Sequence, residues 1–330
     1  MANITIKDVA REAGVAVETV SRVLNNRGYI SQKTRDKVEG AMKKIGYIPN
    51  TFAQGLSKKK MDCIAVIVPH IVHPYFAAVI SELEKVAGER GYKLLVHNSR
   101  GDKKREKYLL QLCQSSFISG VLLFSAEISA NFLKGVQIPV VMVERGPVGN
   151  SVNVQCDNAA GGRMAAEHLM QKGCKKLMVI STTSIVGMPG DERDLEFVRV
   201  CREAGCEVNS YRASEDQYAL LDYHAEIERA LSEHPDVDGI FATSDLIAAQ
   251  VIQCCCRRNI PIPEKVKLVG FDDVPLSMYL YPTLTTIRQP IADIVKCAVD
   301  SMEKISEGKR TRKNIVLPVE LVERESTADR

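Results

Sequence analysis

Polar side chains that could bind a small polar molecule follow several short β-rich runs of the sequence. Glu144 and Arg145 come directly after one run, Ser244 and Asp245 stand just beyond another, and Asp272 follows a third. Because the carboxyl ends of parallel strands meet at one edge of a sheet, and ligands bind beyond that edge, we expect these groups to converge. Carboxylates accept hydrogen bonds and arginine donates them, so the pattern predicts a site for a polar metabolite.

The runs that would position these groups alternate with amphipathic stretches. The predicted strands are Cys63–Val68, Lys93–Asn98, Gly120–Phe124, Pro139–Val143, Lys176–Ser181, Gly239–Ala242 and Val266–Phe271. Stretches such as Tyr75–Arg90 and Leu246–Arg258 are long enough to be crossover helices. The alternation predicts an α/β fold of doubly wound parallel sheets covered on both faces. About 270 residues are many for one such sheet, so we expect two sheets with a ligand cleft between them.

Charge divides the 330 residues unequally. Hydrophobic residues make up 45% and charged residues 26% of the chain, which is enough apolar material for real cores. Residues 1–60 hold 12 Lys and Arg against 5 Asp and Glu, a balance of +7; the whole chain is +3, which leaves −4 for residues 61–330. A small basic head on a mildly acidic body predicts that only the head contacts a polyanion.

The chain has no sequence feature of export or membrane insertion. No basic stretch followed by an apolar one opens it, and no apolar run approaches the ~18–20 residues that span a bilayer. We therefore expect a cytoplasmic protein whose ten cysteines are reduced and mostly buried. His70 and His73, together with His97, suggest a metal site. Because no third ligand stands at a fitting spacing from the His70–His73 pair, we expect solvated loop histidines and no metal.

The basic head has the pattern of three short helices. Thr5 and Asp8 have the spacing of a capping box, which predicts a helix that ends before Gly14. A second helix is expected over residues 16–25 and a third over residues 31–44, because apolar residues recur at helical spacing. Two short helices around a tight glycine-containing turn, backed by a third, form an all-α helix-turn-helix unit.

The second of these helices presents side chains that suit base edges. Arg22 could donate two hydrogen bonds to guanine, Glu18 could accept one from cytosine, and Val17 could meet a thymine methyl. Side chains suited to phosphates are Thr5, Ser21, Asn25, Ser31, Thr34 and Tyr47. The alternative for Glu18 and Arg22, which are four residues apart, is an ordinary surface ion pair.

One long segment of the head matches a known pattern. It runs Thr5-Ile-Lys-Asp-Val-Ala-Arg-Glu-Ala-Gly-Val-Ala-Val-Glu-Thr-Val-Ser-Arg-Val-Leu-Asn25, followed by Thr34-Arg35 and by Gly46-Tyr47-Ile48-Pro49-Asn50. This segment resembles the DNA-binding headpiece of the lactose/galactose repressor (LacI/GalR) family. The resemblance implies a dimeric, effector-responsive transcription factor, usually a repressor, on a pseudo-palindromic operator. It also adds Thr19 to the residues expected at DNA.

Residues 47–61 are expected to connect the head to the body. Asn50 can cap a helix of seven or eight residues there, far fewer than the ~12–15 that are marginal for an isolated helix in water. The resemblance implies that paired hinge helices fold in the minor groove, where Leu56 wedges into a base step and Ala53 and Gln54 lie against the groove. The alternative is a basic flexible linker.

The resemblance extends through the body, which is similar to periplasmic sugar-binding proteins. Its motifs are Val154-x-x-Asp157-Asn158-x-x-Gly161-Gly162, Arg193-x-x-x-Phe197, Thr243-Ser-Asp-x-x-Ala248, Val269-Gly-Phe-Asp272-Asp273 and Pro282-x-Leu-Thr-Thr-Ile-x-Gln-Pro290. The resemblance implies that Arg193 and Asp272 hold the effector and that Phe76, Ser125 and Asp245 line the pocket. An arginine and a carboxylate together can bracket the vicinal hydroxyls of a sugar.

Two alternatives stay open for the body. Arg193 and Asp272 could instead form an ion pair that ties the two subdomains together. The chain has no Trp to stack on a sugar ring, so a nucleobase, an organic acid or a phosphorylated metabolite stays possible beside a sugar as the effector.

The resemblance also implies a domain organisation. Residues 1–46 form the helix-turn-helix domain, residues 47–61 the hinge helix and linker, and residues 62–330 the effector-binding and dimerisation core. One subdomain of the core comprises roughly residues 62–158 with 288–318, and the other 159–287 with 319–330. Closure of the core on an effector would change the spacing of the two headpieces of a dimer. No heptad-rich tail precedes Arg330, so a tetramer built on a coiled coil is not expected.

Two other functions make different demands on the sequence. An exported solute-binding protein would have the same body but needs a signal peptide in place of the basic head. A nucleotide-dependent enzyme needs a G-x-G-x-x-G or G-x-x-x-x-G-K-[ST] turn, and neither occurs. The sequence therefore predicts a regulator that is not an enzyme and has no cofactor, with DNA and a small molecule as its partners.

Overall fold

The computed structural model describes residues 4–25, 27–48, 62–115, 118–124, 128–146, 148–149, 151–182 and 188–329. The chain forms two compact units, residues 1–61 and residues 62–330. Among the described residues, no helix combines the length and the hydropathy that crossing a membrane requires.

The first unit is a bundle of three helices. These are α1 (Ile6–Ala13), α2 (Val17–Asn25) and α3 (Gln32–Ile45), which confirms the three predicted helices. Val9, Val20 and Val38, one from each helix, are fully buried against one another and form the centre of a small core. The backbone N–H of Thr5 donates to the Asp8 carboxylate at 2.9 Å, as the capping-box spacing predicts.

The second unit contains two six-stranded sheets, which confirms the predicted pair of parallel sheets. The first has the order β11-β5-β4-β3-β1-β2 and the second β12-β10-β9-β8-β6-β7. The first sheet comprises β1 (Cys63–Val68), β2 (Lys93–Asn98), β3 (Gly120–Leu123), β4 (Val140–Val143), β5 (Val152–Cys156) and β11 (Asn314–Leu317). The second comprises β6 (Lys176–Ser181), β7 (Glu207–Arg212), β8 (Gly239–Ala242), β9 (Lys267–Asp272), β10 (Thr285–Arg288) and β12 (Glu320–Val322). Neighbouring strands are parallel, except that β12 is antiparallel to β10.

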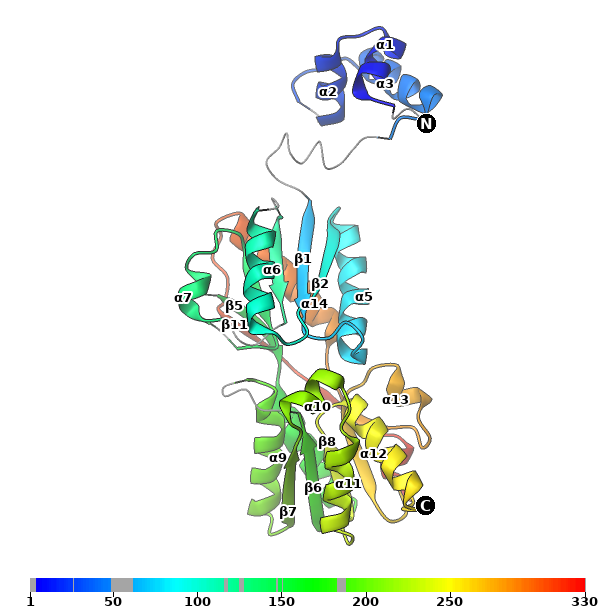
Figure 1. Cartoon of the computed structure of the whole chain (residues 1–330), viewed down its shortest axis with the longest axis vertical. Coiled ribbons are helices and arrows are strands. Elements are labelled where there is room, and N and C mark those ends of the chain that lie inside the picture. The colour runs from blue at the N-terminus through cyan, green and yellow to red at the C-terminus, as the bar shows by residue number, and fades with distance from the viewer. Residues whose placement is uncertain are drawn as a thin grey trace. The chain divides into compact units, whose positions relative to one another are not determined.

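Helices cover both faces of each sheet (Figure 1). The first sheet carries α5 (Pro74–Glu89), α6 (Lys103–Ser115), α7 (Ala130–Leu133) and α14 (Ile291–Ser306). The second carries α8 (Asn158–Gln171), α9 (Asp191–Glu203), α10 (Glu215–Leu220), α11 (His224–Glu233), α12 (Asp245–Arg257), α13 (Leu276–Tyr279) and the short 3₁₀ helix η1 (Glu325–Thr327). Along β1, Ile64 and Val66 pack toward α5 and α14 whereas Ala65 and Ile67 pack toward α6. Because successive side chains point to opposite faces, a strand buried on both faces is a continuous apolar run.

The chain passes between the two sheets three times, after β5, after β10 and after β11. We call the first sheet with its helices the first lobe and the second sheet with its helices the second lobe. Residues beyond the carboxyl ends of strands in both lobes line one cavity. The strand polarity thus places the polar strand-end residues of the two lobes around a common site.

The apolar-run pattern missed β5, β7, β10, β11 and β12. Of these, β7, β11 and β12 are edge strands whose side chains are largely half-buried or exposed. The interior strands β5 and β10 contain buried polar residues, and those of β5 bond to each other: Asn153 donates to Gln155 at 2.6 Å. A strand that faces solvent or satisfies its polar groups internally carries no run of hydrophobic residues.

Candidate ligand cleft and nucleic-acid interface

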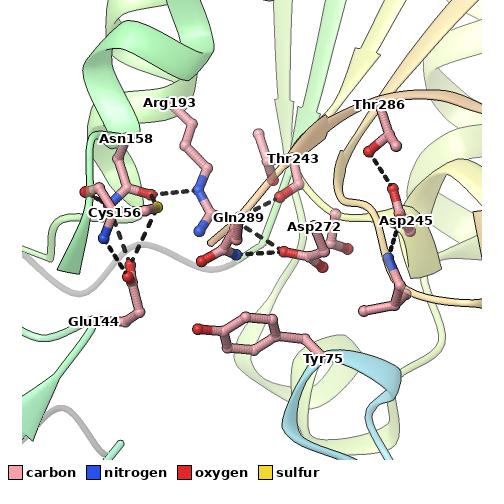
Figure 2. A network of polar contacts seen from close by, with 12 residues as sticks. Tyr75, Glu144, Cys156, Asn158, Arg193, Thr243, Asp245, Asp272, Thr286 and Gln289 are labelled. Atoms are coloured by element: carbon pink, nitrogen blue, oxygen red, sulfur yellow. Dashed lines mark hydrogen bonds and ion pairs between the residues drawn. The ribbon is translucent and has the colours of Figure 1, made fainter. Parts of the chain in front are cut away.

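A cavity of about 140 Å³ lies between the two lobes. Its walls are His73, Tyr75, Phe76, Glu144, Arg145, Thr182, Met188, Gly190, Asp191, Arg193, Tyr218, Thr243, Ser244, Asp272 and Gln289. The cavity therefore combines aromatic surface with carboxylates, guanidinium groups and hydroxyls from both lobes. Figure 2 shows the polar contacts along its wall.

Arg193 of α9 is held in the cavity wall by three neighbours. Its Nε donates to Oδ1 of Asn158 at 2.6 Å, and its Nη1 donates to the carbonyl of Thr243 at 2.9 Å. The guanidinium carbon lies 3.6 Å from the centre of the Phe271 ring, which is a cation–π contact. These contacts fix the orientation of the group before any ligand arrives, so little entropy is lost when it binds one.

Two glycines of α8 allow α9 and the Phe271 ring of β9 to approach closely. A Cβ added to Gly162 would lie 2.1 Å from the carbonyl oxygen of Arg193, and one added to Gly161 would lie 2.5 Å from the Phe271 ring. Both residues belong to the pattern in which the sequence resembles the family. The glycines therefore set the position of Arg193 and of the ring on which it stacks.

We expect Gly162→Ala to weaken ligand binding and to destabilise the body by about 1–3 kcal/mol, because the new methyl group must displace the α9 backbone. Gly88→Ala is a matched control in α5, where an added Cβ meets nothing within 4 Å and helix propensity favours alanine. Thermal melts of both variants, with and without ligand, check the expectation. Equal melting temperatures for Gly162→Ala and the wild type would contradict it.

Asp272 ends β9 in an unusual backbone conformation. Its φ is 123°, in the region that favours glycine, and such outliers concentrate at functional sites. Its Oδ1 accepts a hydrogen bond from Nε2 of Gln289 at 2.6 Å and lies 3.8 Å from Nη1 of Arg193. Arg193 and Asp272 both belong to the second lobe, so the alternative in which their ion pair ties the lobes together is wrong.

Burial raises the pKa of Asp272 to about 7, and the nearby Arg193 opposes the shift. Between its ordinary value of 3.8 and 7, the folded protein retains a proton that the unfolded chain releases. The free energy of unfolding should therefore fall as the pH rises through this window and level off above it. Burial also raises the pKa of Glu106, again to about 7.

We expect Asp272→Asn to flatten the decline of the melting temperature between pH 5 and pH 8, because asparagine does not titrate. Part of the decline should remain because of Glu106. Asp236→Asn, at an exposed carboxylate paired with Lys176, is the control. A melting profile of Asp272→Asn parallel to the wild type over this range would contradict the assignment of that proton to Asp272.

Glu144 contributes a second buried carboxylate, from the first lobe. Its φ is 56°, so it too has a left-handed backbone conformation. One oxygen accepts from the backbone N–H of Cys156 at 2.5 Å and the other from the side chain of Asn158 at 3.2 Å. Burial raises its pKa, and Arg193 opposes that shift. Asn158 thus bonds to both Glu144 and Arg193 and connects a group of each lobe (Figure 2).

Aromatic and histidine side chains at the start of α5 complete the cavity. Among the described residues the buried hydroxyl of Tyr75 has no hydrogen-bond partner, and in Figure 2 it points toward the polar network. Nδ1 of His73 accepts from the backbone N–H of Tyr75 at 3.2 Å, and burial lowers the pKa of His73 to about 4. His70 packs edge-on against Tyr218 at 4.9 Å.

The expectation of solvated histidines is wrong for His70 and His73, which are 5% and 7% exposed. His97 is half-buried. The residues that the structure describes contain no group of three or more His, Cys, Asp or Glu side chains arranged to hold a metal ion.

The structure places the five expected effector residues differently. Arg193, Asp272 and Phe76 line the cavity, and Phe76 packs edge-on against Phe124 at 6.0 Å. Asp245 does not line it. Its carboxylate is fully buried and accepts hydrogen bonds from the Thr286 hydroxyl at 2.6 Å and the Val274 N–H at 3.0 Å. Ser125 lies outside the described residues.

The strand-end pattern pointed to Glu144 and Arg145, which line the cavity, but sequence reasoning missed Tyr218, Thr243 and Gln289 as site residues. Thr243 directly follows a strand, so its position at a strand end could have identified it. Gln289 lies in the last motif of the body. Tyr218 comes from α10, a helix with no corresponding pattern, and only the tertiary fold brings it to the cavity.

The described surface of α2 in the head carries exposed polar side chains. Glu18 and Arg22 are exposed, and in the described head they do not form the alternative ion pair with each other. Val17 is half-buried against the small core, Thr19 and Ser21 are half-buried, and the Asn25 side chain donates to the Ser21 carbonyl at 2.8 Å. Arg22 and Glu18 are therefore available to a partner, whereas Asn25 is already engaged within its helix.

The other predicted DNA contacts lie at helix ends. Ser31 caps α3, where its hydroxyl accepts from the Thr34 N–H at 3.3 Å. Thr5 precedes α1 and is exposed, and Tyr47 follows α3 and packs partly on the core. Because the N-termini of helices attract phosphates, the positions of Thr5 and Ser31 suit backbone contacts, whereas Tyr47 lies beyond the C-terminus of α3. The hinge residues Asn50, Ala53, Gln54 and Leu56 lie outside the described residues.

Comparison with known proteins identifies both units. Residues 5–50 match the model of bacterial regulatory proteins of the lacI family, and residues 166–327 match a periplasmic binding protein-like domain. A sucrose operon repressor of Streptococcus mutans is 34% identical over 97% of this chain and 98% of its own length.

Two solved structures have the same fold. The first, a periplasmic binding protein/LacI transcriptional regulator of Alkaliphilus metalliredigens complexed with D-xylulofuranose, has a TM-score of 0.74 at 30% identity and covers 81% of this chain and 100% of its own. The second is a lac repressor dimer bound to operator and the anti-inducer ONPF, with a TM-score of 0.86 at 23% identity over 99% of this chain and 100% of its own. The chain therefore belongs to the lacI family of bacterial regulatory proteins.

Proposed function

We propose that this protein is a transcriptional repressor that binds a pseudo-palindromic operator as a homodimer and whose operator affinity is controlled by a small sugar in the cleft. The observation that carries the proposal is the presence, in one chain, of a helix-turn-helix unit with exposed Arg22 and Glu18 and of a two-lobed cleft with Arg193 and Asp272 in its wall. The relative that is a sucrose operon repressor supports this combination.

In the DNA part of the proposal, α2 lies in the major groove. Arg22 and Glu18 contact base edges, and Thr5, Ser31, Thr34 and Tyr47 contact phosphates. Two half-sites need two headpieces, and the lac repressor dimer on its operator is a precedent. The linker residues Asn50, Ala53, Gln54 and Leu56 enter the proposal as minor-groove contacts through the family resemblance alone.

In the effector part, a sugar bridges the two lobes. Arg193 and Asp272 of the second lobe and Glu144 and Tyr75 of the first lie around one cavity, so hydroxyls of one ligand can bond to both. A ligand that contacts both lobes binds more tightly to the lobe arrangement in which all these bonds form. This difference in ligand affinity between lobe arrangements couples the cleft to DNA binding. The complex of a related regulator with D-xylulofuranose supports a sugar.

The proposal includes the cellular setting and the absence of catalysis. A repressor must reach the chromosome, so we place the protein in the cytoplasm. The cavity residues bind the ligand through hydrogen bonds. Ligand binding changes the affinity of the protein for DNA and leaves the ligand chemically unchanged.

A two-step experiment tests the proposal. The purified chain is used to select duplexes from a randomised pool, and affinity for the selected duplex is then measured with and without single sugars. We expect a salt-sensitive preference for an inverted repeat and a change in its affinity with at least one sugar. Recovery of no preferred duplex, or a preferred duplex whose affinity no sugar changes, would contradict the proposal.

A further inference from the structure

We infer that the effector of this protein is uncharged, namely an unphosphorylated sugar, and that the cleft excludes sugar phosphates and sugar acids. The inference rests on the proposed function, because it takes the cleft as the effector site. The inference specifies the charge of the effector, which the sequence leaves open.

Carboxylates crowd the cavity wall. Glu144, Asp191 and Asp272 line it, and two of them are almost fully buried. Glu192 follows Asp191 in the first turn of α9 and is exposed beside the cavity rather than in its wall. A phosphate or carboxylate on the ligand would therefore lie near the Asp191 carboxylate and near Glu144 and Asp272, whose raised pKa values show that this wall already disfavours negative charge.

The two arginines in the wall do not offset this charge with a free binding edge. Nε and Nη1 of Arg193 already donate to Asn158 and Thr243. Nε of Arg145 donates to the carbonyl of Phe124 and its Nη1 contacts Sδ of Met188. Recognition of a phosphate by arginine typically uses two parallel N–H donors on one edge of the guanidinium group. On the guanidinium groups of Arg193 and Arg145, each edge therefore contains at least one nitrogen that already contacts another residue.

The start of α9, a natural place for an anion at the cleft, is closed. Its first three N–H groups, those of Asp191, Glu192 and Arg193, donate to the carbonyls of the preceding turn at 3.0, 3.0 and 3.3 Å. The first turn also carries the carboxylates of Asp191, Glu192 and Asp194. Helix N-termini bind phosphates through free N–H groups and the positive end of the helix dipole, and here both are occupied by the protein itself.

Two other helices that start at the cleft are partly closed in a similar way. At α5, Pro74 has no N–H and His73 accepts the N–H of Tyr75. At α12, the Ser244 hydroxyl accepts the N–H of Ile247 at 3.2 Å, and the carboxylate of Asp245 occupies the first turn. At each of these three helix N-termini, at least one first-turn N–H group thus has an acceptor within the protein.

The polar atoms that remain available suit hydroxyl groups. In the described part of the chain, the Tyr75 hydroxyl and Oε1 of Gln289 are buried without a hydrogen-bond partner, and both residues line the cavity. A phenol both donates and accepts, and an amide oxygen accepts. A sugar hydroxyl, which also donates and accepts, can bond to each of them and to the nearby carboxylates without bringing a charge into the cleft.

Matched pairs of sugars and their monophosphates test the inference on the full chain. Calorimetric titrations compare sucrose with sucrose 6-phosphate, D-xylulose with D-xylulose 5-phosphate, D-ribose with D-ribose 5-phosphate and D-fructose with D-fructose 6-phosphate. We expect at least one unphosphorylated sugar to bind and its phosphate to bind at least about 100-fold more weakly, because of like-charge contact. A phosphate that binds as tightly as its sugar would overturn the inference but leave the proposed function standing. Absence of binding by every compound would overturn both.

A charge-removing variant tests the physical cause. In the double variant Asp191→Asn/Glu192→Gln, we expect the ratio of sugar to sugar phosphate affinity to fall by about 10-fold or more, because one carboxylate leaves the cavity wall and a second leaves the exposed first turn of α9 beside it. Glu203→Gln is the matched control, since it removes one carboxylate at the other end of the same helix, where Glu203 pairs with Arg199. An unchanged ratio in the double variant would overturn exclusion by these charges.

Discussion

Replacing Arg193 with alanine is expected to abolish the response of DNA binding to the effector. The guanidinium group is fixed by Asn158, Thr243 and the Phe271 ring, and Arg193 lines the cavity. A hydrogen bond from a charged group contributes about 1.5–3 kcal/mol, so the loss of even one should weaken effector binding about 10- to 100-fold. Affinity for DNA without effector should stay near the wild-type value, because the head forms a separate compact unit.

Arg199→Ala is the matched control for this change. Arg199 lies on the same helix but is half exposed and pairs with Glu196 and Glu203 on the surface. Arg193→Lys tests geometry, since lysine keeps the charge but loses the planar fork; we expect an intermediate loss. Titration of effector into each variant, with a thermal melt to verify folding, provides the measurement. An effector affinity of Arg193→Ala equal to that of Arg199→Ala would remove Arg193 from the site.

Replacing Arg22 with alanine is expected to weaken binding to the preferred operator by about 1–3 kcal/mol, or roughly 5- to 150-fold, and to relax one base position. Arg22 is exposed on α2 and, among the described residues of the head, is not paired with Glu18. A bidentate contact to guanine reads the base itself, so its loss should cost more on the preferred duplex than on a random one.

Arg11→Ala separates base reading from general charge. Arg11 is also an exposed cation of the head, on α1, where it lies 3.3 Å from Asp8. We expect this variant to lose similar, small affinity on specific and random duplexes. Binding-site selection with each variant gives the preference at every position. If Arg22→Ala selects the same bases with the same stringency as the wild type, the reading role of Arg22 is wrong.

Local sequence alone determined the helices of the head and the central strands. The signals in the head act over one or two turns of chain, so they can be recognised without a tertiary structure. They are the capping box of Thr5 and Asp8, the left-handed Gly14 and the apolar spacing in α2. Strands such as β1 are buried on both faces, and burial on both faces requires a continuous apolar run. The family pattern likewise pointed to Arg193 and Asp272, which the structure brings to one cavity.

Only the tertiary structure decided which polar strand-end residues face the ligand. Asp245 and Ser244 are neighbours in sequence, yet Asp245 turns inward to Thr286 and Val274 while Ser244 lines the cavity. Tyr218 reaches the same cavity from a helix that has no motif. The direction of a side chain at a strand end depends on partners far away in the sequence, and a charged group turns inward only where such partners satisfy it. Local spacing cannot contain that information, because the partners meet only when the two lobes have folded.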